Sequence, residues 1–543
     1  MGNQILHIVP KLWLHCMKGV FFLLFAYIAI ISQTGCATTE QTVPAKVSID
    51  GKDWNGHQAA IEKPNDQPVL SRVPGEDISA AVSLADVRKL TDQTILKKIA
   101  LEDECEYIRL AAAARLDALS ASAVRIRGIS RSDIRKGYAI LKMKPVEGKQ
   151  DIDALIEHVR GAKMVLLGEG SHGTVEYYQW RAEISRRLVK DHGFNFIVVE
   201  GDWPSLYQVN RYVKGNIDRS DFHTVLAGLD RWPPWMWKNS VIADLMEWLR
   251  HYNETENRPV GFYGMDVYGI SRSYDQVLET IEREFPEYYQ KVSGLYECLQ
   301  WFKDDMQSYA RAVANRTAHC EKAVNRAYDF IAGNILPVID SEQALNLQQN
   351  AAVLVYGERH YRAMVDPRMD SWNERVKFMH QVVTHLLDYY GEGARGIIWA
   401  HNTHIGDARA TNMARQGNIN IGQILRESLG EQQVRLVGFG SATGTVKAGR
   451  SWGAPGEVMS IPTPVKKSYE YVFSQLPYEI MMFLFDDTNR HGPLMEPLGH
   501  RAIGVLYHAE REHLGNFVPS VLPLRYDAFV FFQKTSALRE LRF

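Results

Sequence analysis

Short runs of continuously apolar residues alternate with long amphipathic stretches from about residue 134 to the end of the chain. Continuous apolar runs are typical of strands that are buried on both faces, and strand–helix alternation indicates an α/β fold. We therefore predict a mostly parallel central sheet flanked by helices. No such run occurs between residues 286 and 364, which predicts a long helical insertion. The predicted strands are 164–167, 196–199, 260–263, 396–400, 434–438, 480–485, 502–507 and 528–532.

The first 35 residues have the features of an export signal. Lys11 and Lys18 precede an apolar run over 20–31, which is shorter than the roughly 20 residues that a spanning helix needs. The following Gln33-Thr34-Gly35-Cys36 resembles a bacterial lipobox, although Gln33 stands where Leu or Val is usual. We expect Cys36 to carry lipid, so that the protein is a lipoprotein of the cell envelope, in the outer membrane and facing the periplasm. The alternative is an uncleaved anchor with an ordinary cysteine.

The segments before the sheet differ in composition. Residues 36–79 are polar, rich in Pro, Gly and Asp, and without periodicity, which predicts a flexible tether. Residues 80–133 have helical periodicity and resemble one HEAT-like repeat, so we expect a small all-α segment there. Because a single repeat cannot bury its own apolar face, it should dock on the main domain or on a protein partner. Residues 134–543 then form the main domain.

Composition and charge exclude some functions. The 543 residues include 62 Lys and Arg against 64 Asp and Glu, a net charge of −2, so no basic excess favours nucleic-acid binding. Five cysteines are too few for a disulfide scaffold. Without Cys16 and Cys36, three remain, and Cys298 with Cys320 could form a bridge or stay as two free thiols.

Ionisable residues directly follow four of the predicted strands. Ligands bind beyond the carboxyl ends of strands in open α/β sheets, so these side chains should converge at one edge. They predict an acid–base site, since titratable groups gathered in one place are typical of catalysis. The residues concerned are Glu169, His172, Glu200, Asp266, His401 and His404.

Two arginines lie on otherwise apolar helix faces. Arg181 aligns with Tyr177, Ile184 and Leu188, and Arg375 has a similar position in a later helix. A buried guanidinium is costly unless a carboxylate pairs with it, so Glu169 and Glu200 are the expected partners of Arg181. In the alternative, each arginine lies at the edge of its stripe with its charge in water.

The glycine loop after the first predicted strand allows several interpretations. Gly168-x-Gly170-x-x-Gly173 matches a dinucleotide fingerprint, but Glu169 would repel a pyrophosphate and His172 would block its close approach. Ser171 could be a nucleophile in a loop close to G-x-S-x-G. A zinc or manganese site would use the three histidines with a carboxylate, although no H-E-x-x-H helix occurs.

The interpretation that needs no cofactor uses His172 as a general base. An imidazole titrates near neutral pH, and a carboxylate from Glu169 or Glu200 can fix its tautomer. Water deprotonated in this way would attack an ester carbonyl, and an arginine or a second histidine would stabilise the oxyanion. A surface-anchored ligand-binding protein without catalysis is the non-enzymatic alternative.

A tryptophan-rich loop, Arg231-Trp232-Pro233-Pro234-Trp235-Met236-Trp237, allows two interpretations. Trp235 and Trp237 could form an apolar wall for a large substrate, together with Asp266 and Arg375 as substrate-binding residues. The same loop could instead plug the core, because tryptophan is highly buried on average.

Several stretches resemble the erythromycin esterase family, in family order from about residue 134 to 538. They include Leu167-Gly168-Glu169-Gly170-Ser171-His172-Gly173-Thr174, Val199-Glu200-Gly201-Asp202-Trp203, Trp235-Met236-Trp237-Lys238-Asn239, Tyr263-Gly264-Met265-Asp266-Val267-Tyr268, Trp399-Ala400-His401-Asn402-Thr403-His404-Ile405-Gly406, Val437-Gly438-Phe439-Gly440 and Arg501-Ala502-Ile503-Gly504-Val505.

The resemblance implies a metal-independent carboxylic ester hydrolase that opens macrolide lactone rings and confers antibiotic resistance. It implies His172 as the base, with Glu169, Arg181, Glu200, His401 and His404 completing the catalytic set, and no cofactor. Val376 departs from the pattern, which has an acid after the arginine. The signal and the HEAT-like segment are also unlike the soluble resistance enzymes, so the resemblance implies the chemistry more firmly than the substrate.

Overall fold

The computed structural model describes residues 48–49, 52–53, 96, 144–148, 150–256, 259–490 and 495–542. The chain divides into two compact units, Met1–Gly128 and Ile129–Phe543. In the first unit the described elements are β1 (Ser48–Ile49) and β2 (Lys52–Asp53), which pair antiparallel. Cys36 and nearly all of the predicted HEAT-like segment lie outside the described residues, so both remain predictions. Among the described helices, none has the length and apolar character needed to cross a membrane.

The second unit is built on a nine-stranded sheet. Its order is β3-β10-β13-β8-β4-β7-β5-β6, and β9 pairs with β8 outside this path. The six strands from β13 to β6 are parallel, whereas β3, β10 and β9 are antiparallel to their neighbours. The strands are β3 (Lys144–Pro145), β4 (Met164–Leu167), β5 (Phe196–Asp202), β6 (Gly261–Asp266), β7 (Gly396–Trp399), β8 (Val434–Ala448), β9 (Glu457–Ile461), β10 (Ile480–Leu484) and β13 (Ala528–Thr535).

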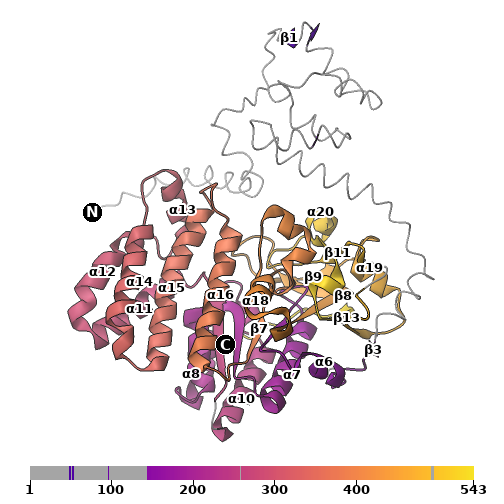
Figure 1. The fold of residues 1–543 in the computed structure, drawn as a ribbon, viewed down its shortest axis with the longest axis horizontal. Helices are drawn as coiled ribbons and strands as arrows, with labels where there is room; N and C mark the ends of the chain where they lie inside the picture. The colour runs from indigo at the N-terminus through magenta and orange to yellow at the C-terminus, as the bar shows by residue number, and fades with distance from the viewer. Residues whose placement is uncertain are drawn as a thin grey trace, which may run out of the picture. The chain divides into compact units, whose positions relative to one another are not determined.

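Helices cover both faces of this sheet, because its central strands are apolar on both sides. Val165 of β4, Ile197 of β5 and Ile397 of β7 share one core cluster with the helices α6 (Asp153–Val159), α7 (Val175–His192), α8 (Trp203–Val213) and α10 (Ser240–Thr255). The helices α16 (Ser371–Tyr390), α18 (Ile421–Leu429) and α19 (Tyr469–Ser474) also contact sheet strands. The alternation of strands and helices thus gives the predicted α/β architecture (Figure 1).

The predicted helical insertion is confirmed, since every described helix or strand between residues 286 and 364 is helical. These elements are α12 (Pro286–Gln300), α13 (Met306–Ala314), α14 (Glu321–Asn334), the short turn Leu336–Val338 and α15 (Ser341–Ala363). They pack together with α11 (Ile270–Glu284) to one side of the sheet (Figure 1). The remaining short helices are α9 (Phe222–Ala227), α17 (Asn402–Ile405), α20 (Glu512–Gly515) and α21 (Leu522–Arg525).

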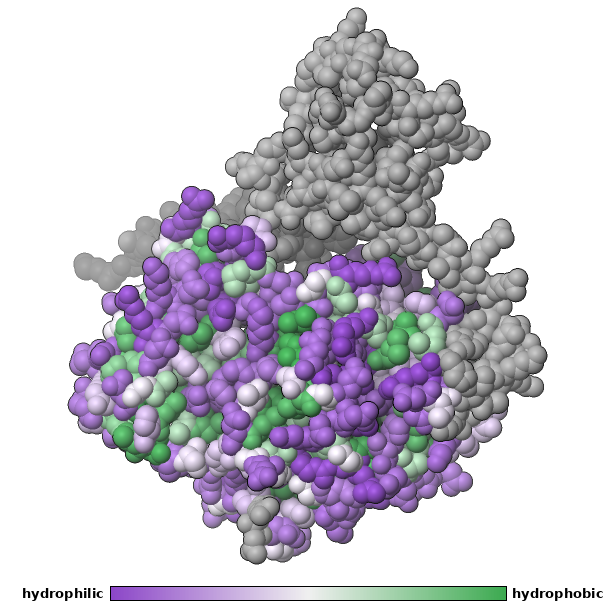
Figure 2. Space-filling model, viewed as in Figure 1, coloured by the Kyte–Doolittle hydropathy of each residue, from purple (hydrophilic) through white to green (hydrophobic). Residues whose placement is uncertain are grey.

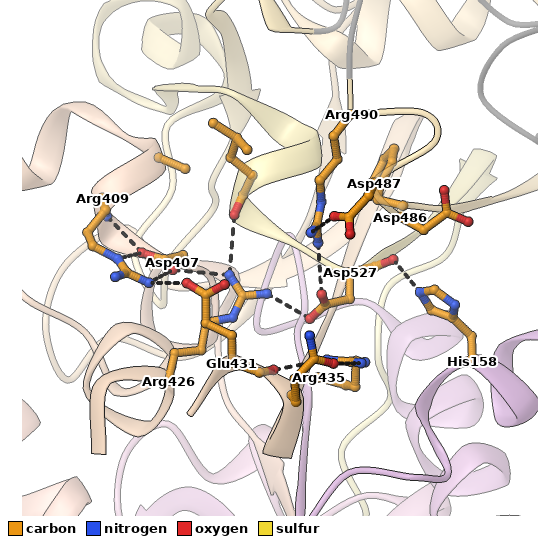
Figure 3. Close-up of a pocket in the computed structure, with 14 residues that line it drawn as sticks. His158, Asp407, Arg409, Arg426, Glu431, Arg435, Asp486, Asp487, Arg490 and Asp527 are labelled. Atoms are coloured by element: carbon orange, nitrogen blue, oxygen red, sulfur yellow. Dashed lines mark hydrogen bonds and ion pairs between the residues drawn. The ribbon is translucent and has the colours of Figure 1, made fainter. Parts of the chain in front are cut away.

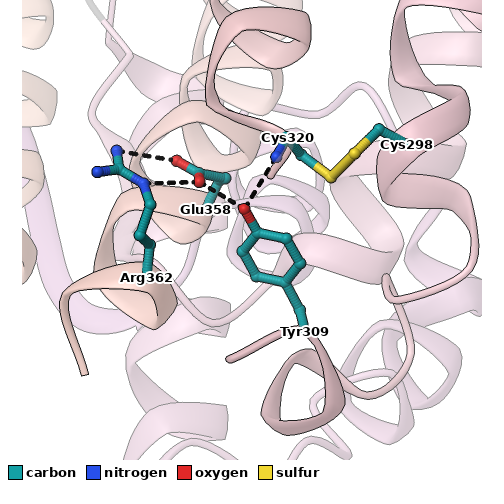
Figure 4. Close-up of a disulfide and its surroundings, with 5 residues drawn as sticks. All are labelled: Cys298, Tyr309, Cys320, Glu358 and Arg362. Carbon is teal, nitrogen blue, oxygen red and sulfur yellow. Dashed lines mark hydrogen bonds and ion pairs between the residues drawn. A yellow bond between two sulfur atoms is a disulfide. The ribbon is translucent and has the colours of Figure 1, made fainter. Parts of the chain in front are cut away.

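A disulfide fixes part of this insertion. Cys298, near the end of α12, is joined to Cys320, just before α14, with their Cα atoms 5.6 Å apart. Beside it, the Tyr309 hydroxyl donates to Glu358 at 2.6 Å and accepts from the Cys320 backbone N–H at 3.0 Å (Figure 4). Glu358 is fully buried, and its charge is balanced by Arg362 at 2.9 Å. The bridge and the buried hydrogen bonds together tie α12, α13, α14 and α15 into one body.

Seven of the predicted strands are present, but the strand predicted over 502–507 is wrong. The strand in this region is β11 (Leu498–Arg501), which pairs with β12 (Phe517–Ser520), and the following segment makes only isolated bridges. The Ile503 N–H donates to the Gly170 carbonyl, and Gly449 N–H donates to the Val505 carbonyl. Ile503 and Tyr507 are buried in these contacts between loops, which residue composition alone does not distinguish from burial in a sheet.

The face of the second unit that is visible in Figure 2 mixes hydrophilic residues with small apolar patches. Among the described residues, large apolar side chains that are exposed are therefore candidates for contacts with a ligand or partner. Two of them are tryptophans: Trp301, at the end of α12, is 79% exposed, and Trp452, between β8 and β9, is 61% exposed.

Candidate active site

The parallel strands β4, β5, β6 and β7 end at a common edge, which we call the carboxyl edge. The residues predicted to converge lie here: Glu169 and His172 follow β4, Glu200 lies near the end of β5, Asp266 is the last residue of β6, and His401 and His404 follow β7. All of these side chains are buried, with at most 7% of each residue exposed. The contacts described below connect them into one network.

The first part of the network fixes the orientation of His172. Its Nδ1 lies 2.9 Å from Oε1 of Glu169, and the other oxygen of Glu169 accepts from Arg181 at 2.8 Å. Arg181 is fully buried, with its guanidinium 4.3 Å from the ring centre of Tyr178 and 4.8 Å from that of Trp399. The expected pairing of Arg181 with a carboxylate is thus confirmed, and Glu169 is the partner.

The second part is centred on Arg375, which emerges from α16. Its guanidinium holds Asp266 in a bidentate contact, at 2.8 and 2.7 Å, and donates to Glu200 at 2.7 Å. The remaining nitrogen lies 3.0 Å from Nε2 of His404. The same Nε2 also lies 3.3 Å from Oε1 of Glu200, so His404 contacts both the guanidinium and the carboxylate. The other oxygen of Glu200 accepts from the backbone N–H of His401 at 2.9 Å.

Two imidazoles in this network have a buried ring nitrogen without a partner among the described residues. Nδ1 of His401 accepts from the backbone N–H of Thr403 at 3.3 Å, which places the ring proton on Nε2. That Nε2 and Nδ1 of His404 are both buried and unpaired. The ring of His401 lies 4.9 Å from that of His172, and the ring of His404 stacks on Trp372 at 4.3 Å. The site therefore offers a ring nitrogen base next to hydrogen-bond donors.

The charges around the three histidines push their pKa values apart. Burial disfavours the charged form of His172, but the carboxylates of Glu200 and Glu169 outweigh this and raise its pKa. Burial and the neighbouring His172 hold the pKa of His401 well below 6.5, and burial also lowers that of His404. Although Glu200 is buried, His404 and Arg375 keep its pKa well below the ordinary value, so it is a carboxylate at neutral pH.

Asn402 connects the loops that carry these histidines. Its side chain donates to the Phe439 carbonyl at 2.6 Å and to Nε2 of His500 at 3.2 Å, and Nδ1 of His500 donates to Glu470 at 2.7 Å. Its backbone N–H donates to the Glu169 carbonyl at 2.9 Å. No local sequence pattern marks His500, Glu470 or Trp372 as part of this site. Asn402 lies between two predicted residues in the chain, which was the only sequence signal for it.

The other predicted residues have different surroundings. Trp235 is 1% exposed and Trp237 is 9% exposed, and both belong to the main core cluster. The Ser171 hydroxyl bonds to that of Thr174. Val376 is fully buried in the apolar face of α16. Among the described residues, no group of three or more His, Cys, Asp or Glu side chains is arranged so that it could hold a metal ion.

A second charged region lies near the amino ends of strands β8 and β13, away from the predicted residues. It surrounds a cavity of about 340 Å³. Arg426 bonds to Asp407 and Asp527, Arg490 pairs with Asp527, and Arg409 pairs with Asp407 (Figure 3). Since these arginines are matched by carboxylates within the cavity wall, the region is a structural ion-pair network.

The sequence profile of erythromycin esterases matches residues 189–535. The chain belongs to the erythromycin esterase family. Membership in this family supports a hydrolase as the activity of the chain, in agreement with the acid–base groups at the carboxyl edge.

Solved structures similar to this member of the erythromycin esterase family share its fold. One is a Bacillus cereus protein, with 19% identity and a TM-score of 0.63, covering 76% of this chain and 100% of the other. A succinoglycan biosynthesis protein has 18% identity, a TM-score of 0.61 and the same coverage. A mutant of the erythromycin esterase EreC in its open conformation has 17% identity and a TM-score of 0.51, covering 73% of this chain and 98% of the other.

The close approach of Asn402 to Gly168 gives a stability prediction. A Cβ atom at Gly168 would collide with the Asn402 side-chain oxygen, so Gly168→Ala must displace the loop that follows β7. We expect this variant to lose about 1–3 kcal/mol of unfolding free energy in urea titrations. In the control Gly161→Ala, the new methyl group meets nothing within 4 Å, and the change should stay within about 0.5 kcal/mol. Equal losses in both variants would contradict this packing constraint.

Proposed function

We propose that the protein hydrolyses an ester or lactone bond with a water molecule that His172 deprotonates. The observation that carries this proposal is the contact from Nδ1 of His172 to Glu169, with Arg181 behind the carboxylate. A carboxylate that accepts from Nδ1 keeps the lone pair of the imidazole on Nε2, which is the atom that can take a proton from water. The side chain of His172 is 9% exposed.

In the proposed reaction, water attacks the carbonyl carbon while its proton passes to Nε2 of His172. The carbonyl oxygen becomes an oxyanion in the tetrahedral intermediate. When the carbon–oxygen bond to the alcohol breaks, the proton on Nε2 passes to the leaving alkoxide, and the imidazole returns to its neutral form. A carboxylic acid and an alcohol are the products, and no covalent enzyme intermediate is needed.

His401 is the proposed donor to the oxyanion. Its Nε2–H is buried and unpaired beside His172, and its low pKa keeps the ring neutral while it donates. Arg375 is less suited to this role because its guanidinium already contacts Asp266, Glu200 and His404. We assign it to holding these groups in place. A preformed donor of this kind contributes about 10²–10³ in rate in other hydrolases.

Membership in the erythromycin esterase family supports a small-molecule ester substrate, and we propose a macrolide or another lactone of similar size. The catalytic set proposed here consists of the chain's own side chains and needs no cofactor. His172 deprotonates the water, and Glu169 with Arg181 holds its ring in place. Glu200, His401 and His404 complete the site.

Replacing the base tests this mechanism directly. We expect His172→Ala to lower kcat/KM for ester hydrolysis by about 10²–10⁴-fold, because water then lacks its proton acceptor. His508→Ala is the matched control, since His508 is an exposed histidine that pairs with Glu510 at 3.5 Å. Product formation would be followed by mass spectrometry as addition of water to the substrate. Full activity of His172→Ala in a folded protein would reject the assignment.

The raised pKa of His172 predicts the pH dependence. The base must be neutral to accept a proton, so kcat/KM should rise with pH through an inflection above 6.5. Because Glu200 is the largest cause that raises this pKa, Glu200→Gln should move the inflection to lower pH. An NMR titration of the His172 imidazole in the wild-type protein and in Glu200→Gln would measure the same pKa shift without turnover. An inflection below 6.5 in the wild-type protein would contradict the proposed environment.

We further propose that Cys36 carries lipid in an envelope compartment. The disulfide between Cys298 and Cys320 supports this location, because such bonds persist in oxidising compartments. Metabolic labelling with a fatty acid should label the wild-type protein in a bacterial host and leave Cys36→Ser unlabelled. Cys105→Ser should label like the wild type. Labelling that survives Cys36→Ser would reject this site.

A further inference from the structure

Three aromatic rings form a platform that none of the roles above uses. Trp452, which is 61% exposed, lies 4.7 Å from Trp232 and 6.2 Å from Tyr268, measured between ring centres. We call Trp232, Tyr268 and Trp452 the aromatic platform. They come from three separate segments: the tryptophan-rich loop, the loop after β6, and the loop between β8 and β9. An exposed tryptophan packed on other rings is typical of a ligand contact.

Hydrogen bonds fix the loop that carries Trp452. The indole N–H of Trp232 donates to the Ala454 carbonyl at 2.7 Å. The Gly449 N–H donates to the Val505 carbonyl at 2.8 Å, and its own carbonyl accepts from Tyr507 at 3.1 Å. The loop is therefore attached on both sides of Trp452. A ring held in place before a ligand arrives loses little conformational entropy on binding, which favours affinity.

The platform adjoins the proposed active site through Tyr268. The guanidinium of Arg375 lies 5.2 Å from the ring centre of Tyr268, and the same guanidinium holds Glu200 and Asp266. Arg231 also lies 5.2 Å from this ring and pairs with Asp202. The arginines beside the platform are thus neutralised by carboxylates. A ligand on the platform would be recognised by its apolar face and shape, with little contribution from its charge.

We propose that the aromatic platform is the subsite that binds the ring of a large ester substrate, such as a macrolactone, beside the catalytic residues. This inference rests on the proposed function and adds the residues that determine its specificity. Trp452 supplies the exposed face, and the rings of Trp232 and Tyr268 pack against it. A broad apolar ring can cover these side chains, whereas a small acyclic ester reaches the site without touching Trp452.

Binding measurements test the platform separately from turnover. The full chain with His172→Ala would keep erythromycin, the probe, intact during equilibrium dialysis. We expect Trp452→Ala in this background to raise the Kd of erythromycin about tenfold, and Trp452→Phe to restore most of the affinity. Trp301→Ala removes an even more exposed tryptophan from the helical insertion and should leave Kd unchanged. An unchanged Kd in Trp452→Ala, or no binding of erythromycin at all, would overturn the proposal.

Kinetics in the wild-type background distinguish this inference from the proposed function. Trp452→Ala should raise KM for erythromycin about tenfold with kcat unchanged, and should leave hydrolysis of p-nitrophenyl acetate unaffected. An equal loss for both substrates would overturn the subsite. If the wild-type protein hydrolyses neither probe, the proposed function fails, while the Kd comparison still decides the platform. If Trp452→Ala lowers binding to phosphatidylglycerol vesicles with Kd for erythromycin unchanged, the platform is a lipid contact and the proposal is wrong.

Discussion

The candidate site depends on pairing buried carboxylates with two arginines. A carboxylate in a protein interior is costly unless a cation compensates it, and otherwise it takes up a proton. Arg181 compensates Glu169, and Arg375 compensates Glu200 together with Asp266. The carboxylate of Glu169 orients His172 through Nδ1. The geometry of the imidazole therefore rests on a guanidinium that is itself enclosed between two aromatic rings.

The same pairing separates the roles of three chemically identical side chains. His172 lies beside two carboxylates and gains affinity for a proton, whereas His401 and His404 lose it through burial. Neutral rings with one N–H can donate without competing for the proton that the base must take. Different surroundings thus produce a base and a donor from one residue type, which is a general way in which active sites divide acid–base work.

Much of the fold could be predicted because apolar runs mark buried strands directly. The convergence of Glu169, Glu200 and His401 followed from parallel strands, whose carboxyl ends must meet. The segment 502–507 was misassigned because burial between loops gives the same composition as burial in a sheet. Contacts such as that of Asn402 with His500 join residues 98 positions apart, and no local pattern marks them. Likewise, the tryptophan-rich loop alone does not show that Trp235 is buried whereas Trp232 supports Trp452.

The hairpin that carries Trp452 belongs to a different part of the chain from the loops that carry the histidines. Its backbone is anchored at Gly449, and its tip contributes nothing to the ion pairs of Arg181 or Arg375. Mutations can therefore accumulate at the tip without raising the electrostatic cost of the acid–base centre. Descendants of one ancestral enzyme can in this way acquire different substrate ranges while keeping a common reaction. A shared reaction among them therefore does not identify the substrate of each.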